Sequence, residues 1–224
     1  IFVFTKKEPM RIILFLAAIL AIAASCENKS AETAQLFCDT TCNSDTFMFK
    51  GKHKLEPFVS ISQKNCLADT LTWSHNRLET NRQMQVSQLL NNPVRINKNA
   101  LNVFINDTSF AVVTFNDCVT GRGYLLKLPF NKKENISKRT SALNAFDKKF
   151  VVADDLRAYA DYSTIYVMDV NTGKEEQMTF KEEYDINFND VHKVIDSINV
   201  SRNRIFVLLK KNGQDVPLEK QINL

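Results

Sequence analysis

The sequence is poor in the residues on which common catalytic and cofactor motifs depend. It has 224 residues, with five glycines, three histidines and one tryptophan. It contains neither a glycine-rich loop for nucleotide phosphates nor a G-x-S-x-G turn that presents a nucleophilic serine. His53, His75 and His192 stand at no spacing that metal-binding motifs use. We therefore predict no catalytic residue set, no metal ligands and no cofactor.

An apolar run near the beginning of the sequence is too short to cross a membrane. Ile12–Ile22 spans 11 residues, whereas a transmembrane helix needs about 20. Arg11 precedes the run, and the small residues Ala23, Ala24 and Ser25 follow it. A basic residue, a short apolar stretch and a small-residue cleavage site are typical of a secretory signal peptide.

Cys26 follows these small residues directly, so the segment resembles the lipobox of bacterial lipoproteins. The resemblance implies that the chain is cut before Cys26 and that acyl chains such as palmitate are attached there. Since one acyl chain binds a membrane only marginally, stable anchoring takes at least two. Translation would then start at Met10, and residues 1–25 would be upstream residues and signal peptide. Residues 26–35 would form a flexible polar tether, and residues 36–224 a single β-rich domain.

The charge gives no reason to expect a nucleic-acid partner. The formal net charge of the whole sequence is +4. Removing residues 1–25 takes away three basic residues and one acidic residue, so the net charge falls to +2. The lysines are also scattered rather than gathered in one motif. We predict a membrane contact through the lipid anchor and no nucleic-acid partner.

Four cysteines remain if Cys26 carries lipid: Cys38, Cys42, Cys66 and Cys118. An even number of cysteines in an exported chain favours disulfides. Cys38 and Cys42 are too close in sequence to close a useful loop, so we expect each to pair with a distant partner such as Cys66 or Cys118. A zinc site and unpaired buried cysteines are the alternatives.

Several segments alternate apolar and polar residues, which is typical of half-buried strands. Examples are the segments Pro57–Ser62 and Asp69–Trp73, and Thr164–Val170 is a strong strand. The pattern predicts an all-β protein of antiparallel hairpins, arranged as a sandwich, an open barrel or a partial propeller-like meander. Val191, Val194, Ile195 and Ile198 stand at helical spacing and predict one short helix near residues 190–198. Residues 75–100 are the least β-like part and hold either a short helix, such as Ser87–Leu90, or a long binding loop.

Three segments can be superimposed as strand, glycine turn and return strand: Phe110–Phe130, Tyr162–Phe180 and Asn203–Leu224. Their turn glycines lie 52 and 40 residues apart, and such periods are typical of propeller blades. Ile165–Lys174 resembles the outer hairpin of a blade in bacterial propeller proteins. The phrases Cys38–Cys42, Thr72–His75 and Phe115–Tyr124 make the body similar to exported lipoproteins of Gram-negative bacteria of the Bacteroidota type. This resemblance implies a location and transfers no activity.

Together these features predict a membrane-anchored cell-envelope lipoprotein whose β-domain is a non-catalytic binding or interaction module. Its partner would be a protein or a glycan. The alternative is an envelope hydrolase or carbohydrate-active enzyme whose site has no recognisable motif. We expect the lipid to lie in the outer membrane rather than the inner one, with the domain facing the periplasm or the cell surface.

Overall fold

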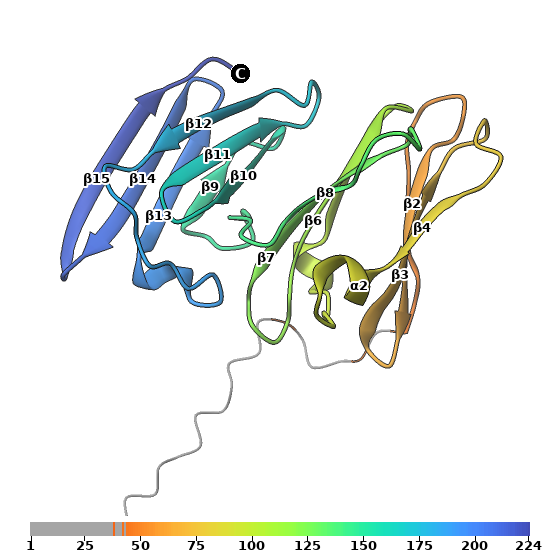
Figure 1. Cartoon of the computed structure of the whole chain (residues 1–224), viewed down its shortest axis with the longest axis horizontal. Coiled ribbons are helices and arrows are strands. Elements are labelled where there is room, and N and C mark those ends of the chain that lie inside the picture. The colour runs from red at the N-terminus through yellow and green to blue at the C-terminus, as the bar shows by residue number, and fades with distance from the viewer. Residues whose placement is uncertain (1–37, 39–41, 43) are drawn as a thin grey trace, which may run out of the picture. The chain divides into compact units, whose positions relative to one another are not determined.

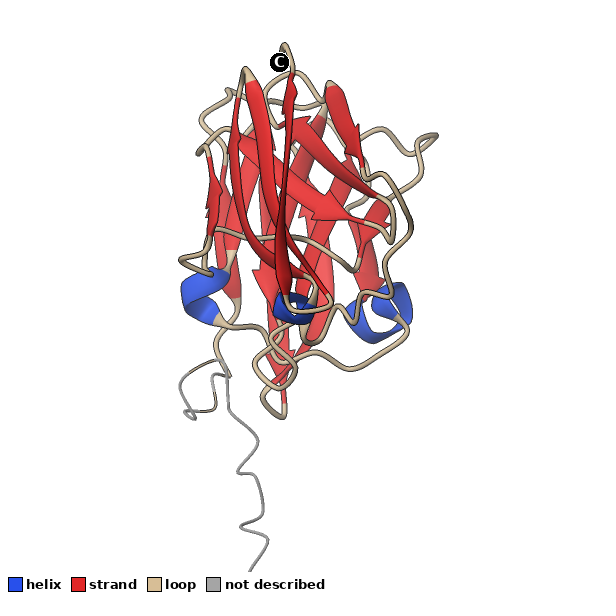
Figure 2. Ribbon diagram, turned by 90° about the vertical axis from the view of Figure 1, so that its left-hand side faces the viewer, coloured by secondary structure: helices blue, strands red, loops and turns tan. Residues whose placement is uncertain are grey.

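The computed structural model describes Cys38, Cys42 and residues 44–224, which belong to one compact unit spanning residues 36–224 (Figure 1). The proposed signal peptide, Cys26 and the tether lie outside the described residues. The described strands are β1 (Phe47–Lys50), β2 (Phe58–Lys64), β3 (Leu67–Ser74), β4 (Arg82–Gln85), β5 (Asn102–Asn106), β6 (Phe110–Asn116), β7 (Gly123–Pro129), β8 (Ser137–Arg139), β9 (Phe150–Val152), β10 (Leu156–Ala160), β11 (Thr164–Asp169), β12 (Glu175–Thr179), β13 (Ile195–Ser201), β14 (Arg204–Lys211) and β15 (Gln214–Gln221). The helical elements are α2 (Val86–Leu90) and the 3₁₀ turns η1 (Lys98–Ala100) and η2 (Val191–Lys193). They lie at one end of the strands (Figure 2).

These strands form four sheets, which follow chain order except that β9 joins the fourth sheet. The first sheet has the order β1-β2-β3-β4 and the second β5-β6-β7-β8. The third has the order β10-β11-β12 and the fourth β15-β14-β13-β9. All neighbours are antiparallel except β13 and β9, which pair in parallel. Each of the first three sheets is thus a meander whose first strand is an edge strand.

The four sheets stack face to face, with an apolar cluster in each of the three gaps. The first cluster joins the first and second sheets, for example Leu71 of β3 and Val113 of β6. The third and fourth sheets share a cluster that includes Val167 of β11 and Val207 of β14. A smaller cluster lies between the second and third sheets. Because side chains alternate between the faces of a strand, β6 and β11 bury residues on both faces, as their nearly continuous burial shows.

The all-β fold and its antiparallel hairpins agree with the prediction, and the described strands form linear sheets rather than a closed barrel. The helix predicted near residues 190–198 is wrong. Only Val191–Lys193 makes a 3₁₀ turn, and Ile195 already begins strand β13. The register of β13 shifts between Ile195 and Ser197. A β-bulge adds one residue to its strand, so Ile195 and Ile198 both face the core three residues apart and imitate helical spacing.

Other local expectations hold. Gly173 and Gly213 have φ angles of 72° and 77°, in the left-handed region that glycine adopts without steric cost. Trp73 is 1% exposed, and its Nε1 donates a hydrogen bond to the Pro129 carbonyl at 2.8 Å. Trp73 is therefore a core residue. Residues 75–100 hold β4, α2 and η1 rather than one long loop.

Candidate functional site

The contact between the second and third sheets changes from apolar to polar along β5 and β6. Phe104 of β5 lies opposite Val112 of β6, and Asn102 lies opposite Thr114. Alternation places both pairs on the same face. Val112 and Phe104 pack in the apolar cluster against the third sheet. The second pair, Asn102 and Thr114, lies two residues away on each strand and offers an amide and a hydroxyl group instead.

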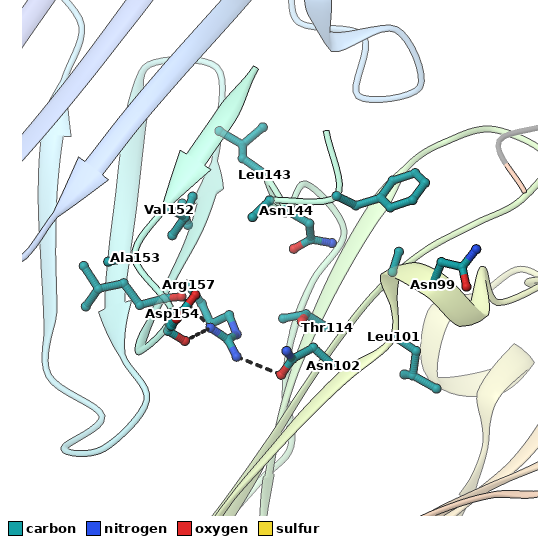
Figure 3. Close-up of a pocket in the computed structure, with 15 residues that line it drawn as sticks. Asn99, Leu101, Asn102, Thr114, Leu143, Asn144, Val152, Ala153, Asp154 and Arg157 are labelled. Atoms are coloured by element: carbon teal, nitrogen blue, oxygen red, sulfur yellow. Dashed lines mark hydrogen bonds between the residues drawn. The ribbon is translucent and has the colours of Figure 1, made fainter. Parts of the chain in front are cut away.

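The third sheet makes the same change. Tyr159 of β10 packs in the apolar cluster, and Arg157 lies two residues earlier on the same face. Arg157 reaches Asn102, and a cavity of about 240 Å³, which Thr114 also lines, opens where these polar side chains replace apolar packing (Figure 3). The remaining lining comes from η1, from the loop 143–146 and from the segment between β9 and β10.

Three hydrogen bonds to neutral oxygens hold the Arg157 guanidinium in place. Its Nη1 donates to the carbonyl of Asp154 at 2.8 Å and to the carbonyl of Leu156 at 2.6 Å. Its Nη2 donates to Oδ1 of Asn102 at 2.9 Å. Figure 3 shows the guanidinium crossing the cavity from β10 towards Asn102. An arginine has five N–H donors, so Nε–H and one Nη2–H find no acceptor among the described residues.

The charge of Arg157 is poorly compensated. Burial lowers the pKa of its guanidinium below the usual value, while Asp154 and Asp155 raise it, because a buried charge loses hydration. In the described part of the chain, no carboxylate lies close enough to Arg157 to form an ion pair. Asp155 is bound elsewhere, by Nε of Arg202 at 2.8 Å. The half-buried guanidinium therefore brings a positive charge to the cavity wall, and Asp154 and Asp155 act on it only from beyond ion-pair distance.

The walls offer further polar groups and an apolar rim. The Asn144 side-chain amide donates to the carbonyl of Phe115 at 3.2 Å and to Oδ1 of Asn116 at 2.9 Å. These bonds fix the loop 143–146 to the second sheet. Phe146, which also lines the cavity, is 43% exposed. A concave site with a few convergent polar groups and an exposed aromatic ring at its wall suits a small polar ligand.

The cavity lining holds no set of groups for hydrolysis. Its only ionisable side chains are those of Asp154 and Arg157. Hydrolysis of a glycosidic bond normally needs two carboxyl groups, and nucleophilic catalysis needs a base beside the nucleophile. The lining offers hydrogen-bonding groups that can orient a ligand.

A second groove of about 440 Å³ lies at the other edge of the same sheet contact, beside β8 and β12. Tyr159 and Tyr166 stack there with ring centroids 4.8 Å apart. The Tyr159 hydroxyl donates to Glu175 at 3.3 Å, and the Tyr166 hydroxyl donates to Asp161 at 2.8 Å. Burial alone would raise the pKa of Asp161, but hydrogen bonds from Ser163 and Tyr166 outweigh burial and lower it. These carboxylates are engaged with protein donors.

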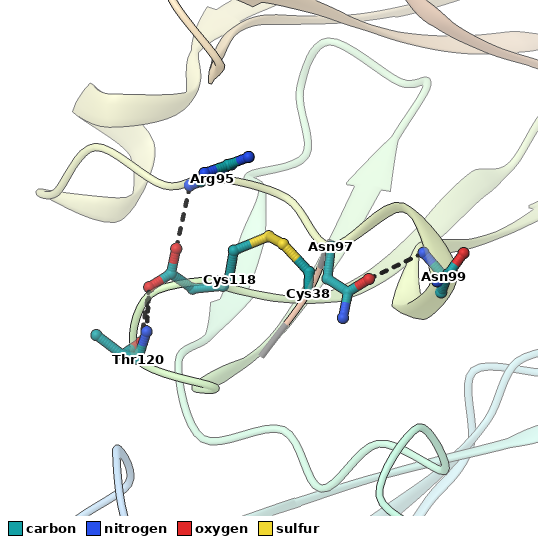
Figure 4. Close-up of a disulfide and its surroundings, with 7 residues drawn as sticks. Cys38, Arg95, Asn97, Asn99, Cys118 and Thr120 are labelled. Carbon is teal, nitrogen blue, oxygen red and sulfur yellow. Dashed lines mark hydrogen bonds between the residues drawn. A yellow bond between two sulfur atoms is a disulfide. The ribbon is translucent and has the colours of Figure 1, made fainter. Parts of the chain in front are cut away.

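The four candidate cysteines all form disulfides. Cys38 is joined to Cys118, 80 residues away, and Cys42 is joined to Cys66, 24 residues away. Cys118 is fully buried. Beside it, Asp117 accepts from the backbone N–H groups of Arg95 and Thr120 (Figure 4). Two disulfides are typical of a protein exported to an oxidising compartment.

The aspartates between residues 155 and 169 are held by donors of the protein. Asp155 and Asp169 bind Arg202, and Asp161 accepts from Tyr166. Within Cys38, Cys42 and residues 44–224, no three metal-binding side chains cluster. Across the same residues, none of the helices has the length and apolar character needed to cross a membrane.

His192 and Arg122 are also held by hydrogen bonds within the protein. His192 binds Asp147 through Nε2 at 2.5 Å, and none of the three histidines lines the cavity. Arg122 does not lie free in solvent. Its Nη2 donates to the Thr140 hydroxyl at 3.1 Å, so it fastens the turn before β7 to the residue that directly follows β8.

No protein-family model matches the chain, and no curated protein matches it closely enough to count as a relative. The site is therefore argued from its own geometry. Sequence reasoning missed it because Asn102, Thr114 and Arg157 are far apart in the chain. One signal was available in the sequence. Thr114 is a polar residue in the otherwise apolar strand β6, on the same face as Val112.

Proposed function

We propose that this protein is a lipid-anchored binding module of the bacterial cell envelope, tethered through Cys26, with the cavity at Arg157 as its ligand site. The observation that carries the proposal is the cavity itself. Polar groups from β5, β6 and β10 converge on a space between two sheets, and no catalytic set accompanies them. The two disulfides support an exported setting.

Anchoring through Cys26 rests on the lipobox-like segment before it. An acylated cysteine would leave only the disulfide-bonded cysteines in the folded part, so no free thiol would be exposed to oxidation. The outer membrane is the proposed location, with the domain held away from the bilayer by residues 26–35. A protein or a glycan of the envelope is the proposed partner.

Metabolic labelling with an alkyne analogue of palmitate tests the anchor. The wild-type protein should incorporate the label and sediment with membranes, whereas Cys26→Ala should do neither. A pull-down from solubilised envelope then tests the binding role, with Cys26→Ala as the mislocalised control. An unlabelled wild-type protein would contradict the anchor, and recovery of no specific partner would contradict the binding role.

An envelope carbohydrate-active enzyme is the second candidate, because the groove at β8 and β12 brings Asp161 and Glu175 to one surface. The lowered pKa of Asp161 argues against its use as a general acid, which needs a raised pKa. Turnover of aryl glycosides that Asp161→Asn abolishes would favour the enzyme. Equal background rates for the wild type and this variant would favour the binding module.

A further inference from the structure

The polar cavity between the second and third sheets has a chemical preference that its residues define. Its positive group is Arg157, whose guanidinium is half-buried and bound only to neutral oxygens. A guanidinium that has lost part of its hydration is stabilised by a nearby group of opposite charge. Within residues 44–224, no side chain supplies that partner at ion-pair distance. A negative group on a ligand would supply the missing ion-pair partner of Arg157.

The donors left on Arg157 match a carboxylate. Nε–H and one Nη2–H remain after the three bonds to Asp154, Leu156 and Asn102. A carboxylate accepts two N–H donors of a guanidinium through two parallel bonds, a pairing that is stronger than one between neutral groups. A neutral ligand could accept the same two hydrogen bonds, but it would leave the charge uncompensated.

The rest of the cavity suits a hydroxyl-rich body of limited size. Its volume of about 240 Å³ holds about eight water molecules at roughly 30 Å³ each, which is the scale of a monosaccharide. The side chains of Asn99, Asn102, Thr114 and Asn144 can donate to or accept from hydroxyl groups. Phe146 offers an exposed apolar surface for one face of a sugar ring. The Asp154 carboxylate also lines the cavity and disfavours a second negative charge.

We propose that this cavity binds a sugar acid of monosaccharide size that carries a single carboxylate, with Arg157 as the carboxylate-binding residue. This inference rests on the proposed binding function and names the class of ligand for it. The ligand enters between the edge strands β5 and β10, its carboxylate meets Arg157, and its hydroxyl groups meet the asparagines.

The test uses the purified full-length chain and two pairs of probes: D-glucuronate with D-glucose, and D-galacturonate with D-galactose. Calorimetric titration or saturation-transfer NMR gives the affinities. At least one uronate should bind ten times or more tightly than its neutral counterpart. Failure of both uronates to bind, or equal binding of acid and neutral sugar, would overturn the proposal.

Two variants remove the carboxylate site by different routes. Arg157→Gln removes the charge and should weaken uronate binding more than tenfold. Asn102→Asp places a carboxylate beside Arg157, so it should pair with the arginine and repel the ligand while leaving the unfolding temperature unreduced. The matched control is Arg139→Gln, because Arg139 lies at the opposite edge of the same sheet contact, over the Tyr159 ring. This control should bind as the wild type does.

The variants also separate this inference from the proposed function. Uronate binding that survives Arg157→Gln and Asn102→Asp but disappears in Arg139→Gln would place the ligand in the other groove and overturn the assignment. If acylation at Cys26 and recovery of an envelope partner succeed while both uronates fail, the binding module stands and the ligand class is wrong. If the uronates bind and Cys26 carries no lipid, the anchor is wrong and the cavity assignment stands.

Discussion

The two halves of the sheet stack are held together by different means. The first and second sheets receive the N-terminal segment through two disulfides, Cys38–Cys118 and Cys42–Cys66. The third and fourth sheets and their loops carry eight ion pairs of Lys or Arg with Asp or Glu between residues 149 and 220. A covalent link responds to reductant and is indifferent to acid, whereas ion pairs respond to acid and salt. The cavity at Arg157 lies where the two halves meet.

The two halves can therefore be destabilised separately, one by removing disulfides and the other by removing ion pairs. On the chain-entropy model, a loop of 80 residues closed by a disulfide stabilises the fold by about 4.5 kcal/mol, and one of 24 residues by about 3.5 kcal/mol. The ion pairs are individually weaker because most are exposed. Asp169 and Asp196 are the exceptions. Asp169 is buried and pairs with Arg202, and Asp196 has Lys149 at 2.9 Å and Lys210 at 2.7 Å from its carboxylate.

The largest effect is expected from removing the long disulfide. The double variant Cys38→Ser with Cys118→Ser should lose about 4 kcal/mol of unfolding free energy, because the unfolded chain regains the entropy of an 80-residue loop. Urea denaturation measures the loss. Hydrogen exchange should show faster opening in the first two sheets and little change in β13 to β15. Equal acceleration in both halves would contradict the division.

A smaller loss is expected from filling the space at Gly123, the first residue of β7. A Cβ there would lie 2.1 Å from the Ala142 carbonyl oxygen, and Ala142 belongs to the cluster between the second and third sheets. Gly123→Ala should cost about 3 kcal/mol, in the range of overpacked cores, and should weaken binding at the cavity.

Gly213→Ala is the matched control for this substitution. Nothing lies within 4 Å of its Cβ position, and only the φ angle of 77° is strained. It should cost about 1 kcal/mol and leave the cavity unchanged. Thermal unfolding in parallel measures both variants, and a smaller loss for Gly123→Ala than for Gly213→Ala would show that the two sheets are not closely joined.

The smallest effect is expected on the stability of the folded state at low pH. Hydrogen bonds from Lys210 and Lys149 lower the pKa of Asp196 to about 2. A carboxyl group with a lowered pKa stabilises the folded state above its unfolded pKa of about 3.9, and this contribution disappears as the pH falls towards 2. Wild-type stability should therefore fall between pH 4 and pH 2 more steeply than that of Asp196→Asn. Parallel curves for the two proteins would rule out a role for Asp196.

The sequence predicted the strands that have one buried face or two, because their apolar periodicity is local. Pro57–Ser62 and Thr164–Val170 are examples that correspond to β2 and β11. It missed β4 and β8, which are short and polar and have mostly exposed residues. The bulge at Asp196 gave β13 the apolar spacing of a helix, because an inserted residue interrupts the two-residue period of inward-facing side chains in a strand.

The candidate site was out of reach for a different reason. Its residues are ordinary in their own strands, and only the stacking of the second and third sheets brings Asn102 to Arg157 across 55 positions of sequence. The disulfides are similar, since four cysteines allow three pairings and spacing alone does not choose between them.

The ligand site can be located by hydrogen exchange of the full-length chain, with and without saturating D-glucuronate. Exchange should slow at residues 99–102, at residues 143–146 and at residues 153–158, and it should not change at residues 138–141. Protection of residues 138–141 alone, or no protection anywhere, would show that the cavity between the second and third sheets is not the ligand site.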